Sequence, residues 1–177
     1  MNSQPEANAI RVVLVDDNTT LRQALRDILE AYANIEVIGE ASDGEEAIVA
    51  VTKLQPTIVV MDINMPKMDG LTATRLIRAE YPHIAVVGLS GEQKDYMLYS
   101  MQSVGASEVV HKDNAATTLY GAIQKAVAAV QRILVMQETP ASQRAREESE
   151  PSDPITLISE TDLVEKLKPQ TGQEEQS

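Results

Sequence analysis

The stretch Thr57-Ile-Val-Val-Met-Asp62 is a run of apolar, mostly β-branched residues that ends in a carboxylate. A short run without a polar position predicts a β-strand buried on both faces, as strands are in a parallel sheet. Two further runs, Ile10–Val15 before it and 84–89 after it, are also almost wholly apolar. We therefore expect these three runs to form the central strands of one parallel sheet.

Two other runs have the features of edge strands. The run Ile35–Ala41 alternates, with Glu36 and Glu40 on one face, and the run 108–110 is short. Between the runs, apolar residues recur every three or four positions, which predicts amphipathic helices. Strands that alternate with helices indicate an α/β domain with helices on both faces of the sheet. The expected fold is a flavodoxin-like (βα)5 doubly wound parallel sheet in strand order 2-1-3-4-5.

Two helix ends are marked in the sequence. Ser42, with Glu45 three residues later, predicts a capping box at the start of the second helix. Gly105 follows the fourth helix where a left-handed cap is expected.

Composition and charge exclude several classes of function. The 177 residues contain no cysteine, which excludes disulfides, thiolate catalysis and cysteine-bound zinc. The net charge is −12, and a surface this negative repels nucleic acid and anionic lipid. No signal peptide is recognisable, and no apolar run is long enough to cross a bilayer. We expect a cytoplasmic protein that binds neither nucleic acid nor membranes directly.

The character of the chain changes after Met136, where the apolar periodicity stops. Residues 137–177 hold four basic and ten acidic residues, a net charge of −6. We interpret 9–136 as one folded domain and 137–177 as a flexible, disordered acidic tail, with a short helix near 161–168. Scattered Ile and Leu residues leave open a second role for the tail, as a peptide that docks on a partner.

Polar residues follow four of the apolar runs. They are Asp16 and Asp17 after the first run, Asp62 after the third, Ser90 after the fourth and Lys112 after the fifth. Because the carboxyl ends of parallel strands lie along one edge, we expect these side chains to converge there. Crowded carboxylates repel one another unless a cation is bound, and ligation by oxygen alone suits Mg²⁺. Such a site permits attack of a carboxylate on a phosphoryl group.

Four spaced motifs carry a resemblance to a known family. They are Val-Leu-Val-Asp16-Asp17, Val-Val-Met-Asp62-Ile-Asn-Met-Pro66-Lys-Met-Asp69-Gly70, Gly-Leu-Ser90-Gly91 and Gly105-Ala-Ser-Glu-Val-Val-His-Lys112. Through them, residues 9–136 resemble the receiver domain of response regulators in two-component (phosphorelay) signal transduction. The chain is most similar to receivers fused to helix-turn-helix output domains and to receivers of hybrid kinases.

The resemblance implies a phosphoacceptor and a metal. Asp62 would accept a phosphoryl group from a sensor histidine kinase or a phosphotransfer protein, giving an aspartyl phosphate. Mg²⁺ would be bound by Asp17, Asp62 and the backbone carbonyl of Asn64, with Asp16 acting mainly through water. The protein would be a phosphoprotein that switches, not an enzyme with turnover.

The resemblance also implies how the phosphoryl group is held. Ser90 would be the switch hydroxyl, Gly91 would donate its N–H to the phosphoryl group, and Lys112 would contact the same group. Pro66 and Gly70 would shape the loop after the phosphorylation site.

Phosphorylation is expected to change a surface that binds another protein. This surface comprises helix 94–104, strand 108–110 and helix 115–136, and its partner is a downstream protein or, as a homodimer, a second copy. No DNA-binding output domain is recognised in the sequence.

One departure from the family keeps an alternative open. Val109 stands three residues before the lysine, where receivers usually carry Tyr or Phe. The alternative is a degenerate receiver that is not phosphorylated and acts as a protein-interaction module. A phosphatase of the haloacid-dehalogenase type is a second rival, but its nucleophile follows the first strand, whereas Asp62 follows the third.

Overall fold

The computed structural model describes residues 9–91 and 95–137. The expected tail beyond Gln137, with its short helix near 161–168, lies outside the described residues. In chain order the elements are β1 (Ile10–Val15), α1 (Thr19–Glu30), β2 (Ile35–Ala41), α2 (Gly44–Leu54), β3 (Ile58–Asp62), α3 (Gly70–Glu80), β4 (Ala85–Ser90), α4 (Asp95–Ser103), β5 (Glu108–His111), a 3-10 turn (Lys112–Asn114) and α5 (Ala115–Gln137).

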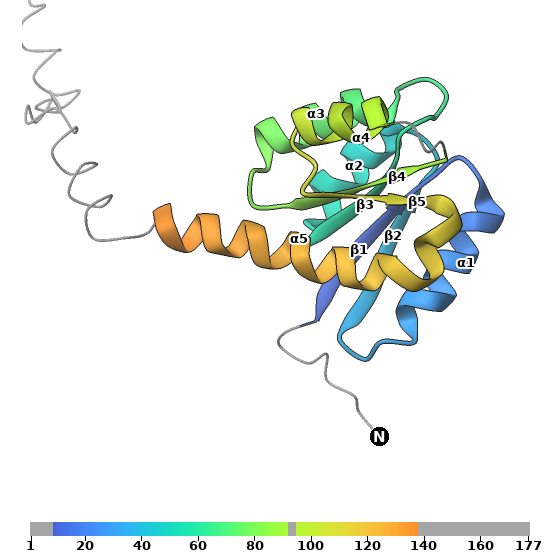
Figure 1. Ribbon diagram of the computed structural model, residues 1–177, viewed down its shortest axis with the longest axis horizontal. Coiled ribbons are helices and arrows are strands. Elements are labelled where there is room, and N and C mark those ends of the chain that lie inside the picture. The colour runs from blue at the N-terminus through green and yellow to red at the C-terminus, as the bar shows by residue number, and fades with distance from the viewer. Residues whose placement is uncertain (1–8, 92–94, 138–177) are drawn as a thin grey trace, which may run out of the picture. The chain divides into compact units, whose positions relative to one another are not determined.

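The described strands form one parallel sheet in the order β2-β1-β3-β4-β5. This order confirms the flavodoxin-like prediction. Figure 1 shows α1 and α5 on one face of the sheet and α2, α3 and α4 on the other. β3 lies at the centre of the sheet, and every residue in it is buried. Its uninterrupted apolar run is therefore explained by burial on both faces, as predicted.

Two hydrophobic cores separate along the sheet because successive side chains of a strand point to opposite faces. On one face, Val12, Val60 and Val87 pack with Leu25 and Leu29 of α1 and with the inner side of α5. On the other face, residues such as Val13, Val59 and Val86 pack against α2, α3 and α4. No helix in the described part of the chain is both long and apolar enough to span a membrane.

The strand ends place polar residues at one edge. β3 and β4 each extend one residue beyond the expected runs, so that Asp62 and Ser90 are the last residues of their strands. In the strand register, Asp62 is paired with Leu89, and Ser90 is paired with His111. The carboxyl edge of the sheet therefore presents these side chains together.

The capping prediction at α2 was wrong by one residue. Asp43 is the N-cap, and its side chain accepts a hydrogen bond of 2.9 Å from the amide of Glu46. Ser42 instead donates from its amide and hydroxyl to the carboxylate of Glu46, at 2.9 and 2.8 Å. The predicted left-handed cap at Gly105 is confirmed, with φ of 105°.

Candidate functional site

Three aspartates meet at the carboxyl edge of the sheet. Asp16 and Asp17 follow β1, Asp62 ends β3, and one carboxylate oxygen from each lies within 4.8 Å of the others. Asp16 and Asp62 are almost completely buried, at 1% and 2% exposure, whereas Asp17 is exposed to solvent. The cluster thus has a buried floor and one open side, and its donors are oxygens of the kind that Mg²⁺ prefers.

Lys112 joins the two buried carboxylates. It directly follows β5, and its Nζ lies 2.7 Å from Oδ2 of Asp16 and 2.9 Å from Oδ2 of Asp62. At these distances the ammonium forms close ion pairs with both carboxylates. Three strands of the sheet therefore contribute to one ion-pair network, as the polar strand ends predicted.

Burial and charge act in opposite directions on these groups. Burial raises the pKa of Asp62, the hydrogen bond from Lys112 opposes that shift, and the nearby charge of Asp16 adds to it. Burial alone would lower the pKa of Lys112, but hydrogen bonds with Asp16 and Asp62 raise it above its usual value. The ammonium therefore stays charged and offsets part of the repulsion between the carboxylates.

The backbone around Asp16 is fixed on several sides. Its amide donates to the carbonyl of Ala41 at 3.2 Å, and its Oδ1 accepts from the amide of Asn18 at 2.8 Å. Its carbonyl accepts a hydrogen bond from Nη1 of Arg22. Asn18 in turn caps α1, since its side chain accepts from the amide of Leu21. The two acidic residues after β1 are thus held by the start of α1.

The remaining predicted site residues lie around Asp62. The amide of Asn64 donates to Oδ1 of Asp62 at 3.4 Å. Ser90 is completely buried at the end of β4, and Gly91 is exposed after it. A methyl group on Gly91 would lie 3.9 Å from Cδ of Lys112, so this backbone borders the lysine. Asn64, Ser90 and Gly91 therefore lie at the carboxyl edge of the sheet with the acidic cluster.

The family model of the response regulator receiver domain matches residues 12–124. The chain belongs to this family. DegU, a transcriptional regulatory protein of Brevibacillus brevis, is 35% identical over 124 residues, which are 70% of this chain and 52% of that protein. Protein-glutamate methylesterase/protein-glutamine glutaminase 3 of Geobacter sulfurreducens is 40% identical over 103 residues, 58% of this chain and 28% of that protein. The chain therefore spans about half the length of the first relative and less of the second.

A solved structure has the same fold. It is the CheX-CheY-BeF3-Mg+2 complex from Borrelia burgdorferi, with a TM-score of 0.61 and 26% sequence identity. The alignment covers 65% of this chain and 87% of that one. The domain described here is a receiver of two-component signalling, and the acidic cluster is its characteristic feature.

The loop after β3 in this receiver depends on one glycine. A methyl group on Gly70 would lie 1.9 Å from the carbonyl oxygen of Asp62, a distance that no real contact allows. The amide of Gly70 also donates to the carbonyl of Ile63 at 3.0 Å. Gly70 therefore lets α3 begin directly against the backbone of Asp62, which supports the predicted loop-shaping role.

Sequence reasoning missed two contacts near the receiver site. Lys67 reaches Oδ2 of Asp43 at 2.6 Å and ties the loop after β3 to the start of α2. Arg22 contacts Asp16, as described above, and also pairs with Glu40 at 3.0 Å. A signal for Arg22 was present, because a cation near a helix N-terminus is unfavourable unless a local partner compensates it.

Val109 and His111 lie in β5, close to Lys112 in the chain. Val109 is half-buried, and a methyl group on Gly88 would lie 3.5 Å from it and 3.0 Å from Met101. His111 has only 15% of its side chain exposed. Its Nδ1 accepts from the amide of Asp113 at 3.3 Å, while Nε2 is buried and unpaired among the described residues.

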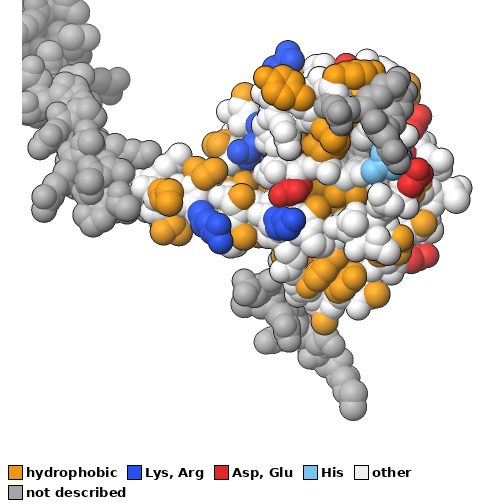
Figure 2. Space-filling view, in the orientation of Figure 1, with side chains coloured by type: hydrophobic (Ala, Val, Ile, Leu, Met, Phe, Trp, Pro, Cys, Tyr) orange, Lys and Arg blue, Asp and Glu red, His pale blue; other side chains and the backbone are white. Residues whose placement is uncertain are grey.

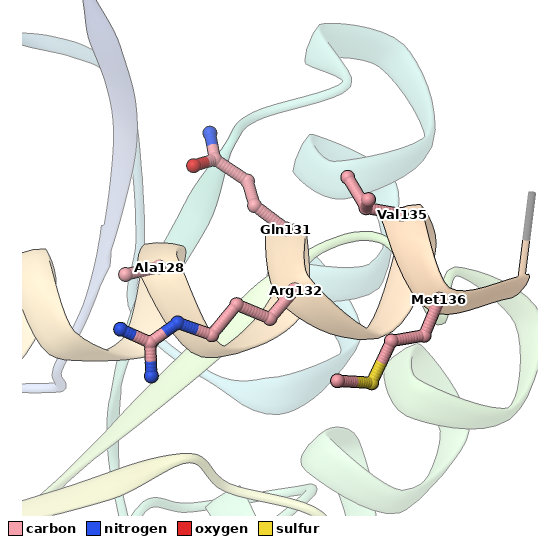
Figure 3. A pocket seen from close by; sticks show the side chains of 5 residues that line it. All are labelled: Ala128, Gln131, Arg132, Val135 and Met136. Carbon is pink, nitrogen blue, oxygen red and sulfur yellow. The ribbon is translucent and has the colours of Figure 1, made fainter.

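Apolar surface gathers elsewhere, along α5 and α4. Figure 2 shows hydrophobic side chains along α5, and Ile133, Val135 and Met136 are 51%, 66% and 72% exposed. A shallow cavity of about 350 Å³ lies on the last turns of α5, and none of the three aspartates of the acidic cluster lines it (Figure 3). Its lining consists of Ala128, Gln131, Arg132, Val135 and Met136. On α4, Tyr96 and Tyr99 are 59% and 75% exposed.

Proposed function

We propose that this receiver accepts a phosphoryl group on Asp62 from a histidine kinase or a phosphotransfer protein, in a reaction that depends on Mg²⁺. The observation that carries the proposal is the shared position of Asp16, Asp17, Asp62 and Lys112. Carboxylate oxygens of the three aspartates come within 4.8 Å, and one ammonium bridges the two that are buried. Carboxylates this close repel one another, Lys112 offsets part of that repulsion, and a bound divalent cation would offset the rest.

The chemistry is a displacement at phosphorus. A carboxylate oxygen of Asp62 forms a bond to the phosphorus of the donor's phosphohistidine, and the P–N bond breaks. The electron pair of that bond stays on the histidine nitrogen, and the three phosphoryl oxygens move with the phosphorus. Because Asp62 must be ionised to attack, the charge of Lys112 next to it favours the reactive form.

Mg²⁺ would be held by Asp17, Asp62 and the carbonyl of Asn64, with Asp16 contributing mainly through water, and when bound it would neutralise charge on the transferred oxygens. Lys112 neutralises charge on the same group, and Gly91 donates its backbone N–H. Ser90 donates its hydroxyl once the group has arrived. These roles follow the family resemblance, and the places of the residues at one edge of the sheet support them.

The output is a changed protein-binding surface over α4, β5 and α5. Lys112 follows β5, and Ser90 ends β4 shortly before α4, so a movement of either residue is transmitted directly to these elements. Exposed Tyr96 and Tyr99 on α4 suit recognition by a protein partner. The partner is a downstream protein or a second copy of the chain.

The alternative, a receiver that is not phosphorylated, rests on Val109. A side chain of this size fills less space than a ring, so the aromatic form of coupling is absent at that position. The acidic residues and the lysine nevertheless retain their full ion-pair geometry. This retention favours the phosphorylated function.

Phosphorylation is tested with a small phosphodonor such as acetyl phosphate, with and without Mg²⁺, on a phosphate-affinity gel. Asp69→Asn is a matched control, because Asp69 lies in the same loop but caps α3 through the amide of Thr72 at 2.8 Å, a role that Asn also fills. We expect a Mg²⁺-dependent shift for the wild type and for Asp69→Asn, and none for Asp62→Asn. Equal shifts for the wild type and Asp62→Asn contradict the proposal.

A further inference from the structure

Arg22 lies on α1, just beyond the acidic cluster, with only 12% of its side chain exposed. Three of its nitrogens have acceptors in three segments of the chain. Nη1 donates to the carbonyl of Asp16, Nη2 to Oγ1 of Thr19 at 3.3 Å, and Nε to Oε2 of Glu40 at 3.0 Å. A planar guanidinium with acceptors on several sides is fixed in orientation.

The carbonyl that Arg22 holds belongs to the peptide unit between Asp16 and Asp17. A peptide unit is planar, so fixing its oxygen also fixes the direction in which the chain enters Asp17. Asp16 has further restraints through its amide and its carboxylate. Asp17 is exposed, and its placement depends on the backbone that precedes it.

Arg22 is itself held by a charge network. Glu40 lies on β2 beside β1, and it also pairs with Arg26 at 2.8 Å. Arg26 contacts Glu30 at 2.9 Å and the carbonyl of Val37 at 3.1 Å, and among the described residues none of these partners belongs to the acidic cluster. The two arginines therefore share Glu40, but only Arg22 reaches the metal-ligand backbone.

We infer that Arg22 is a positioning residue for the cation site: it orients the Asp16–Asp17 peptide unit so that both carboxylates face the ion. This inference rests on the proposed Mg²⁺ site and deepens it. Groups that orient metal ligands from outside commonly change metal affinity by about 10- to 100-fold when removed.

The test is the Mg²⁺ dissociation constant, measured by isothermal titration calorimetry on the full chain, which has no Trp for a fluorescence signal. The variants are Arg22→Met, Arg22→Lys and, as the matched control, Arg26→Met, which also removes a partner of Glu40. Thermal melting in the absence of Mg²⁺ confirms that each variant is folded at the temperature of titration.

We expect Arg22→Met to weaken Mg²⁺ binding about tenfold. Arg22→Lys should recover part of the affinity, since one ammonium can still reach the carbonyl of Asp16, and Arg26→Met should stay within about twofold of the wild type. Equal Mg²⁺ affinity in the wild type and Arg22→Met overturns this inference alone. So does an equal loss in Arg22→Met and Arg26→Met. Absence of Mg²⁺ binding in the wild type overturns the proposed function together with the inference.

Discussion

Around the acidic cluster, the two sides of the sheet are packed differently: the side of β1 and β3 is held by hydrogen bonds and by backbone in close contact, whereas the side of β4 and β5 packs against small or flexible side chains. We call the first side the binding half (Asp16, Asp17, Asp62 and Gly70) and the second the switch half (Gly88, Ser90, Met101 and Val109). In the binding half, a methyl group on Gly70 would meet a carbonyl oxygen at 1.9 Å. In the switch half, one on Gly88 would meet side-chain atoms and no backbone: the flexible side chain of Met101 at 3.0 Å and Val109 at 3.5 Å.

This difference indicates that the binding half orients ligands and that the switch half changes conformation. A site that orients a cation and a nucleophile must be rigid, because misplaced ligands lose affinity and rate. A surface that changes shape must have alternative packings of similar energy, and Met adapts to such changes. The following experiments test the comparison, from the largest expected effect to the smallest.

Gly70→Ala should damage the binding half most. The methyl group has no space beside the carbonyl of Asp62, so the loop and the phosphoacceptor must shift, at a cost of about 3 kcal/mol or more in the free energy of unfolding. Denaturant unfolding measures this cost, and the phosphate-affinity gel should show that phosphorylation is lost.

Gly121→Ala is the matched control for that substitution. Gly121 lies in α5, and nothing lies within 4 Å of a methyl group placed there. Alanine should stabilise the helix by about 0.5–1 kcal/mol. Equal stabilities for the two alanine variants would contradict the rigid binding half.

Lys112→Met should leave Asp16 and Asp62 buried together without their shared cation. Breaking a partly buried ion pair in this way costs about 2 kcal/mol, somewhat less than for fully buried pairs because the lysine is 22% exposed. Melting in a chelator should show this loss, and added Mg²⁺ should raise the melting temperature more in the variant than in the wild type. If Mg²⁺ raises the melting temperature equally in both proteins, Mg²⁺ and Lys112 do not act on the same carboxylates.

Much of this site could be predicted from sequence, for a physical reason. Parallel strands end along one edge, so Asp16, Asp62 and Lys112 could be brought together from the strand order alone. The predicted fold and strand order were confirmed. The roles of the site residues stay predictions, although all of them lie at the expected edge.

What sequence reasoning missed depends on three-dimensional contact. The salt bridge between Lys67 and Asp43 joins loops that are far apart in the chain, and no periodicity indicates it. The N-cap of α2 was placed on Ser42 because Glu45 lies three residues later, as in a capping box. Asp43 and Glu46 have the same spacing, and Ser and Asp are about equally good caps, so the local sequence does not decide between the two neighbours.

Glu40→Gln removes the carboxylate that pairs with Arg22 and Arg26, and the pH dependence of stability tests the contribution of these ion pairs. Burial works to raise the pKa of Glu40, but hydrogen bonds from Arg26 and Arg22 outweigh it, so the pKa is below its usual value. The carboxylate therefore stabilises the fold above its unfolded pKa, and this contribution is lost as pH falls through the lower, folded pKa. At neutral pH the variant should be about 1 kcal/mol less stable, and the difference should vanish in strong acid. A gap that is unchanged with pH would contradict the ion-pair assignment.

Gly88→Ala should have the smallest effect of these substitutions. The added methyl group requires Met101 to move by a few tenths of an ångström, which its flexible side chain allows. We expect a loss of less than about 1 kcal/mol in the free energy of unfolding and phosphorylation close to that of the wild type. A loss as large as that of Gly70→Ala would show that the two halves are equally rigid.

The most direct test of the central claim is to locate the phosphoryl group chemically. An aspartyl phosphate is reduced by borohydride to homoserine, which marks the acceptor residue in a peptide map. After treatment with acetyl phosphate, homoserine should be found at position 62 alone, and only when Mg²⁺ is present. Homoserine at Asp16, Asp17 or Asp69, or at position 62 to the same extent without Mg²⁺, would contradict the account.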